Sequence, residues 1–151
     1  MTRIDFAFGA PDRLRAACRT ARKRFQAGQR LVVYCADGGR LAAFDRMLWA
    51  LEDVSFVPHV LANDALAADT PVLLTAGDPA AALTLATTGD SRPWLLNLDD
   101  GCPPNFDGYE RLLEIVSDDP ADRQAARQRW RDYQNAGHAL HSHDLSRAGE
   151  A

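Results

Sequence analysis

Residues 31–51 read LVVYCADGGRLAAFDRMLWAL, and this stretch decides the fold class. Its first five residues form a continuous apolar run, which is typical of a parallel strand covered on both faces. A short loop with two glycines follows, and then four apolar residues recur at helical spacing and predict a helix. These residues are Leu41, Phe44, Leu48 and Leu51. The stretch therefore predicts a strand followed by a helix, the repeating step of an α/β protein.

The chain before this stretch supplies the first part of a β-α-β unit. Residues 3–8 alternate charged and apolar side chains and predict a strand. Asp12 follows a Gly-Ala-Pro break and can cap a helix that runs to about Ala27, where Gly28 supplies a stop. A strand, a helix and the apolar run at 31–35, in this order, predict two parallel strands of one sheet.

Three further apolar runs, each bounded by turn residues, predict the remaining strands at 71–75, 93–98 and 112–116. A last helix is predicted from near Pro120 to just before Gly137. The sequence thus predicts the α/β class, with a single three-layer domain and a mostly parallel sheet of about five strands, Rossmann-like and of the mononucleotide-binding type. We assign residues 1–140 to this domain and residues 141–151 to a polar, frayed C-terminal tail.

Composition and charge exclude several classes of protein. The chain has 151 residues, 46% hydrophobic and 25% charged, which fits one globular domain with a substantial core. Its net charge of -4 argues against a protein whose whole surface binds phosphate backbones. No apolar run approaches the roughly 18 residues of a membrane span, and the N-terminus lacks the order of a signal peptide, so we expect a cytoplasmic protein. Three scattered cysteines, Cys18, Cys35 and Cys102, fit reduced thiols better than disulfides or a zinc motif.

The candidates for a small-molecule or metal site are weak. The loops at 8–11 and 37–40 follow predicted strands, but neither has the glycine spacing of a dinucleotide site or the lysine of a P-loop, and tight turns explain both. His138, His141 and His143 form an H-x-x-H-x-H cluster in the polar tail, where a preorganised metal site is not expected. No serine or cysteine lies in a nucleophile-elbow context. We therefore expect no cofactor, no metal and no catalytic residues, and keep a small nucleotide-binding enzyme on a Rossmann-like fold as the alternative.

The segment 48–62, LWALEDVSFVPHVLA, is unusual because its loop is apolar. Trp49 and Phe56 flank a short turn, and Pro58 forbids regular strand pairing there, so we expect a surface segment with exposed aromatic area. Exposed aromatic residues beside a loop suggest an anchor for a protein partner. Packing of both rings into the core of the domain is an equally good interpretation of the sequence.

The helix at 121–137, ADRQAARQRWRDYQNAG, is unusual because arginines recur along one side of it. One basic ridge is formed by Arg123, Arg127, Arg131 and Gln134, and Trp130 and Tyr133 are expected beside it. Guanidinium groups bind carboxylates in a fork, so this combination suits an acidic peptide that ends in a bulky apolar residue. A solvated helix face is one alternative. Direct binding of single-stranded DNA is another, which the acidic chain disfavours.

Two motifs lie in these segments. Leu48-Trp49 is followed by FVPH at 56–59, and residues 126–137 read ARQRWRDYQNAG. In both motifs, and in the order of its predicted strands and helices, the sequence resembles the chi subunit family of the bacterial DNA polymerase III holoenzyme. Residue 130 is tryptophan where a tyrosine is common in that family, and the segment after Gly137 is rich in histidine.

The resemblance implies a Rossmann-like accessory subunit without catalytic activity, which acts in the clamp-loader complex during DNA replication. Members of the family bind the psi subunit on one surface and the acidic C-terminal tail of single-stranded DNA-binding protein on another. From the acidic charge and the lack of a long apolar run, we also expect no direct nucleic-acid binding and no membrane association. Carried over by motif position, the psi-binding residues would be Trp49 and Phe56. The tail-binding residues would be Val116, Arg127, Trp130 and Arg131.

Overall fold

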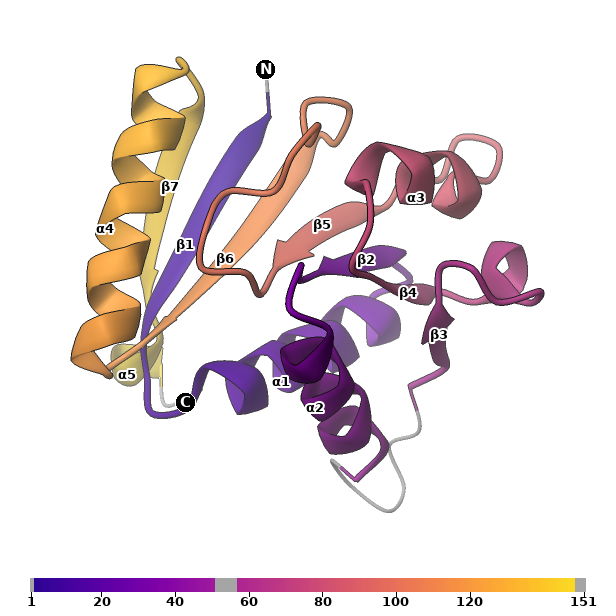
Figure 1. Ribbon diagram of the computed structural model, residues 1–151, viewed down its shortest axis with the longest axis horizontal. Helices are drawn as coiled ribbons and strands as arrows, with labels where there is room; N and C mark the ends of the chain where they lie inside the picture. Colours follow the sequence, from indigo (N-terminus) through magenta and orange to yellow (C-terminus); the bar gives the residue numbers. More distant parts are fainter. Residues whose placement is uncertain (1, 51–56, 149–151) are drawn as a thin grey trace.

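The computed structural model describes residues 2–50 and 57–148 of the chain. These residues form one sheet of seven parallel strands in the order β3-β4-β2-β5-β6-β1-β7, with helices on both faces (Figure 1). The α/β class and the three-layer architecture predicted from the sequence are confirmed. The strands are β1 (Arg3–Ala10), β2 (Leu31–Tyr34), β3 (His59–Leu61), β4 (Val72–Thr75), β5 (Trp94–Asn97), β6 (Arg111–Ser117) and β7 (Ala139–Asp144). The helices are α1 (Arg13–Gln26), α2 (Gly38–Trp49), α3 (Pro79–Ala86), α4 (Pro120–Asn135) and α5 (Leu145–Ala148), with a short 3-10 helix at Ala67–Asp69.

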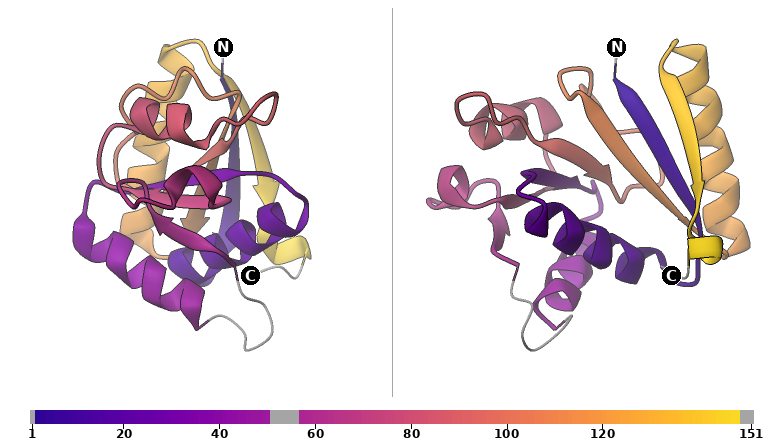
Figure 2. Two further views of the ribbon diagram at one scale, coloured as in Figure 1. Left: turned by 90° about the vertical axis from the view of Figure 1, so that its right-hand side faces the viewer. Right: turned by 180° about the vertical axis from the view of Figure 1, so that it is seen from behind.

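Helices α1 and α2 pack on one face of the sheet, and α3 and α4 pack on the other (Figure 2). Successive side chains of the central strand β2 point to opposite faces. Leu31 and Val33 therefore pack with α1 and α2, whereas Val32 and Tyr34 pack with α3 and α4. All four are buried, and each aliphatic one contributes roughly 1.5–3 kcal/mol by leaving water. Burial on both faces explains why residues 31–35 are apolar without alternation.

Aspartates at the ends of loops start the helices. The Asp12 carboxylate accepts a hydrogen bond from the Arg15 N–H at 3.1 Å, as the sequence predicted. Asp119 caps α4, whose first residue is a proline and therefore has no N–H to satisfy. Just after the end of α1, Gly28 has a φ of +78°, a left-handed conformation that glycine adopts without strain.

Two edge strands, β3 and β7, were not predicted from the sequence. β3 has only three residues, and β7 has mostly exposed side chains. Each pairs along one side, β3 with β4 and β7 with β1, so neither needs the apolar pattern of a central strand. The prediction of about five strands was too low for this reason.

The C-terminal segment is also part of the sheet. Residues 141–144, predicted to be frayed, belong to β7 and pair in parallel register with residues 5–8 of β1. Helix α5 follows and lies against β1. Backbone pairing orders this segment even though its side chains carry no burial signal. The expectation of a frayed tail is therefore wrong for residues 141–148.

Candidate functional site

A groove between α4 and β1 brings four of the sequence-predicted residues together. Val116, Arg127, Trp130 and Arg131 all line it, and its volume is about 340 Å³. The other lining residues are Phe6, Phe8, Arg123, Ala126 and Ser142. We call this feature the α4 groove. It lies where the end of β6 passes into α4, so a strand end supplies its floor and a helix supplies its rim.

The floor of the α4 groove is apolar and held in place by ring packing. The Phe6 ring packs edge-on against Trp130, with centroids 5.1 Å apart, and against Tyr133 at 5.9 Å. Val116 and Ala126 are buried beside these rings. Such T-shaped contacts add roughly 0.5–1.5 kcal/mol beyond burial and limit ring movement. The groove therefore presents a preformed apolar surface to a ligand side chain.

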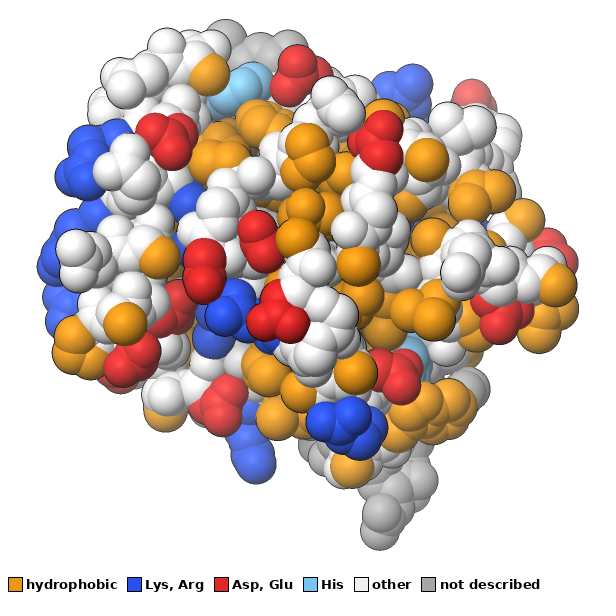
Figure 3. Space-filling model, in the orientation of Figure 1, with side chains coloured by type: hydrophobic (Ala, Val, Ile, Leu, Met, Phe, Trp, Pro, Cys, Tyr) orange, Lys and Arg blue, Asp and Glu red, His pale blue; other side chains and the backbone are white. Residues whose placement is uncertain are grey.

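The rim of the α4 groove is basic. Arg123, Arg127 and Arg131 follow one another at intervals of four residues, and all three are exposed. Figure 3 shows basic side chains along the outer side of α4, at the left of the view. Arg131 donates to the Gln128 side chain at 3.0 Å, an exposed contact that leaves further N–H groups of its guanidinium for a ligand. An apolar floor below a cationic rim suits a ligand that carries both an apolar group and negative charge.

Sequence reasoning missed Phe6 and Phe8 as residues of the α4 groove. They are two positions apart on β1, so their side chains share one face of the sheet. That spacing was readable in the sequence. The position of α4 over this face was not, because it depends on β1 lying between β6 and β7.

A buried polar network fixes α4 to the sheet below the groove. The Glu114 carboxylate is fully buried in β6 and accepts hydrogen bonds from Arg129 Nε at 3.0 Å and from the Tyr133 hydroxyl at 2.6 Å. Asn97 Nδ2 donates to it as well, at 2.9 Å. Burial raises the pKa of Tyr133, with the Glu114 carboxylate adding to the effect, so the phenol stays protonated and remains a donor. The position of Glu114 inside the apolar run LLEIV could have signalled this network, since a buried carboxylate needs partners.

The second predicted surface is only partly described. Trp49 is the last residue of α2 and is 56% exposed, and its ring lies 4.7 Å from the His59 ring. Phe56 lies outside the described residues. Val57 and His59 are buried rather than part of an exposed apolar loop, so that expectation is wrong for them. The buried ring of His59 has Nδ1 at 2.6 Å from the Val57 carbonyl and Nε2 at 3.0 Å from Asp45.

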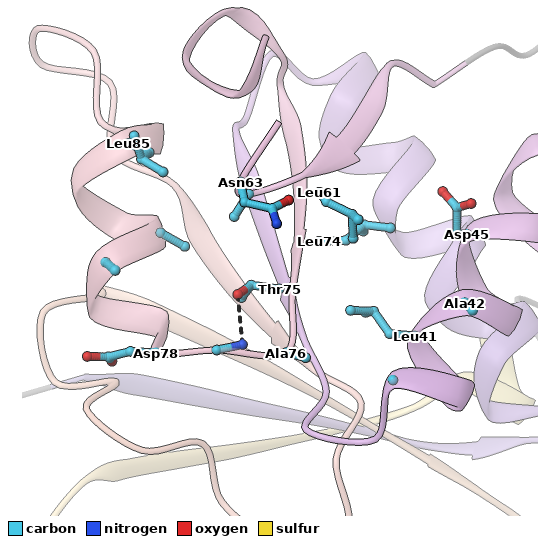
Figure 4. A pocket seen from close by; sticks show the side chains of 15 residues that line it. Leu41, Ala42, Asp45, Leu61, Asn63, Leu74, Thr75, Ala76, Asp78 and Leu85 are labelled. Atoms are coloured by element: carbon cyan, nitrogen blue, oxygen red, sulfur yellow. Dashed lines mark hydrogen bonds between the residues drawn. The ribbon is translucent and has the colours of Figure 1, made fainter. Parts of the chain in front are cut away.

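A larger groove lies between α2 and α3 at the carboxyl end of β4, and we call it the α2–α3 groove. Its volume is about 750 Å³. One wall is α2, with Leu41 and Asp45, and the other is α3, with Ala81 and Leu85 (Figure 4). The floor is the end of β4 and the segment after β3. No sequence pattern indicated this groove, because its two walls belong to helices on opposite faces of the sheet.

The histidines of the C-terminal segment do not form a metal site in the part of the chain that the structure describes. No group of three potential ligands converges there. His143 instead contacts Asp5, and the His138 ring lies 5.0 Å from Phe106.

None of the described helices is long and apolar enough to cross a membrane.

Asp5 joins the three strands β1, β6 and β7. Its carboxylate is buried and contacts Arg111 Nε at 2.7 Å, His143 Nε2 at 2.9 Å and Arg3 Nη2 at 3.1 Å. Burial by itself raises the pKa of Asp5, but the hydrogen bonds from His143, Arg3 and Arg111 outweigh it and lower the pKa to about 2. Asp5 is therefore ionised in the folded protein over the whole physiological range.

We expect Asp5→Asn to lower the free energy of unfolding at pH 7 by on the order of 2 kcal/mol. The reason is that hydrogen bonds in the folded state stabilise the ionised carboxylate relative to the unfolded state. The contribution of the Asp5 carboxylate to the free energy of unfolding is fully present above its unfolded pKa of 3.8. It is lost as the pH falls towards the folded pKa of about 2. The difference between wild type and variant should therefore shrink between pH 5 and pH 3. Urea unfolding at both pH values measures it, and a difference independent of pH would contradict the assignment.

Comparisons with known proteins agree on one family. The family model for the DNA polymerase III chi subunit, HolC, matches residues 1–141. DNA polymerase III subunit chi of Pseudomonas aeruginosa is 35% identical over 151 residues, which cover 97% of this chain and 99% of that protein. The Escherichia coli subunit chi is 26% identical over 125 residues, 83% of this chain and 80% of that protein. The subunit of the same name from Haemophilus influenzae is 23% identical over 130 residues, 85% of each chain. The chain therefore belongs to the DNA polymerase III chi subunit family.

Proposed function

We propose that this chain is a non-catalytic adaptor of the DNA polymerase III holoenzyme. In this proposal it joins the clamp-loader complex by binding psi through Trp49 and Phe56. It also binds the acidic C-terminal tail of single-stranded DNA-binding protein through Val116, Arg127, Trp130 and Arg131. The adaptor thereby tethers the polymerase to coated template during replication.

The observation that carries the proposal is the chemistry of the α4 groove. A tail that is acidic and ends in phenylalanine offers a ring, a terminal carboxylate and further carboxylates. The apolar floor at Val116 and Trp130 matches the ring. The arginines at 127 and 131 lie one turn apart on the exposed side of α4, so one can take the terminal carboxylate while the other meets an aspartate further back.

The alternative, a small nucleotide-binding enzyme, has less support. In α/β sheets nucleotides bind in crevices at the carboxyl ends of the strands, which is where the α2–α3 groove lies. Its lining contains Asp45 and Asp78 and, among the described residues, no lysine or arginine. Phosphate groups would therefore meet negative charge. A thermal-shift screen of nucleotides beside an acidic tail peptide separates the two functions, since stabilisation by a nucleotide and not by the peptide would favour the enzyme.

We expect Trp49→Ala to weaken psi binding by about 2 kcal/mol, roughly thirtyfold, because a half-exposed tryptophan that packs on a fixed histidine ring is a typical interface anchor. Calorimetric titration of psi into the full chain measures the change. Leu66→Ala is the matched control, since Leu66 is also a large exposed apolar residue, at 62%. Equal affinities of wild type and Trp49→Ala, with both proteins folded, would contradict the assignment of this surface.

A further inference from the structure

We propose that the α2–α3 groove receives the apolar face of a basic amphipathic helix of psi, next to the Trp49 anchor. This inference rests on the proposed function, because it extends the same partner beyond Trp49 and Phe56. It concerns an additional surface that neither sequence motif contains.

The shape of the groove fits a helix. Leu41 and Asp45 are four residues apart on α2, and Ala81 and Leu85 are four residues apart on α3, so each wall is one stripe of a helix. Figure 4 shows the two stripes on either side of the strand ends. Small side chains also line these walls, at Ala42, Ala81 and Ala82, and they let the backbone of a third helix come close. Added strand pairing is a poorer choice, because the edge strand β3 has only three residues and offers few backbone hydrogen bonds.

The lining of the groove fits an apolar face rather than a polar small molecule. Leu61 and Leu85 are 53% and 43% exposed at its border, although such large apolar side chains are usually covered. Few polar side chains line it, and two of them are engaged with nearby backbone N–H groups. Thr75 Oγ accepts from the Gly77 N–H at 3.0 Å, and Asp78 accepts from the Ala80 N–H at 2.9 Å. Polar groups are thus a minority in the described lining, and apolar side chains make up most of it.

The charge of the groove selects a basic helix. Asp45 and Asp78 lie on opposite walls and are the charged side chains among the described lining residues. Figure 3 shows hydrophobic side chains gathered between α2 and α3 with acidic side chains beside them. Lysines or arginines that flank the apolar face of the incoming helix would pair with these carboxylates and steer association.

A chain of contacts connects the groove to the Trp49 surface. The Trp49 ring packs on His59 at 4.7 Å, and His59 Nε2 lies 3.0 Å from Asp45, which is itself in the groove wall. Trp49 and Asp45 are also four residues apart on α2. A partner anchored on Trp49 is therefore within one helical turn of the groove.

The test is titration of purified psi into the full chain carrying substitutions in either wall. We expect Leu85→Lys, and Ala42→Lys on the opposite wall, to weaken psi binding at least tenfold, since each places a like charge against a basic helix. Leu66→Lys is the control outside the lining and should bind within twofold of wild type. Asp78→Asn keeps the helix cap, because asparagine caps as well as aspartate, and should weaken binding two- to threefold at low salt.

The outcomes separate this inference from the proposed function. Wild-type affinity in both lysine variants, together with loss of binding in Trp49→Ala, overturns the groove inference and leaves the Trp49 surface intact. Failure of psi to bind the wild-type chain overturns both. Circular dichroism of each variant checks folding, and because Ala42 is exposed, Ala42→Lys decides the matter if Leu85→Lys is unfolded.

Discussion

Replacing Arg129 with alanine should lower the free energy of unfolding by about 3–5 kcal/mol. The Glu114 carboxylate is fully buried, and Arg129 supplies the positive charge 3.0 Å from it. Without that charge, Glu114 keeps a longer contact to Arg13 at 3.8 Å and two neutral donors, which compensate its buried charge less well. Urea unfolding at pH 7 measures the loss.

Arg127→Ala is the matched control, because it removes the same side chain two residues earlier on the exposed side of α4. It should change stability by no more than about 0.5 kcal/mol. A double-mutant cycle with Glu114→Ala adds a second check. The double variant should cost less than the sum of the single ones, since each single change leaves a charge without its main partner. A loss below about 1 kcal/mol in Arg129→Ala would contradict this account of the network.

We therefore expect two different roles among the arginines of α4. Arg129 holds the helix on the sheet through Glu114 and through a hydrogen bond to the Asp100 carbonyl at 3.0 Å. Arg127 and Arg131 face solvent above the α4 groove. Arg129→Ala should disturb tail binding only through the position of the helix, whereas Arg127→Ala should reduce binding with the fold intact. Stability and affinity measured on the same pair of variants distinguish the two roles.

The central strands were predictable from the sequence because burial on both faces leaves a continuous apolar signal, as in residues 31–35. The edge strands were not. β7 reads ALHSHD and is ordered by backbone pairing with β1, to which its side-chain pattern gives no guide. β3 follows Pro58 and is too short for periodicity to show. The sequence therefore predicted the class and layers of the fold but not the width of the sheet.

The candidate site was likewise predictable from the sequence only in part. Arginine spacing placed Arg127 and Arg131 on one side of a helix, because residues four apart in a helix are neighbours. Contacts between elements that are far apart in the sequence could not be predicted from it. Phe6 reaches Trp130 only because β1 lies beside β6. The α2–α3 groove likewise exists only because helices on opposite faces flank the end of β4.

The proposed psi and tail surfaces lie at opposite sides of the molecule. The α4 groove adjoins β1 and β7 at one end of the sheet, and α2 with the β3 edge lies toward the other (Figure 1). In the proposed function, this separation would allow psi and the tail to be bound at the same time. Tethering requires simultaneous binding, so the placement of the surfaces supports the proposed function.

Removing the last residue of the acidic tail should weaken its binding to the α4 groove roughly a hundredfold. The full tail gains roughly 1.5–3 kcal/mol from burying its phenylalanine ring and roughly 1.5–3 kcal/mol from each charged hydrogen bond to Arg127 or Arg131. Ordering a flexible peptide offsets part of this gain. About -8 kcal/mol corresponds to a micromolar dissociation constant, so we expect micromolar affinity that weakens with salt. Such a contact can be released repeatedly, and several tails on one coated strand restore its strength.

The shortened peptide loses the ring and shifts the terminal carboxylate away from its guanidinium, a combined loss of about 3 kcal/mol or roughly a hundredfold. Calorimetric titration compares the full tail, the shortened tail, and the full tail with Arg127→Ala protein. Arg92→Ala removes an exposed arginine that does not line the groove, so it controls for a general effect of charge. If the shortened peptide binds as well as the full one, the α4 groove does not recognise the end of the tail. Equal weakening by Arg127→Ala and Arg92→Ala would mean that charge alone, and not the groove, attracts the peptide.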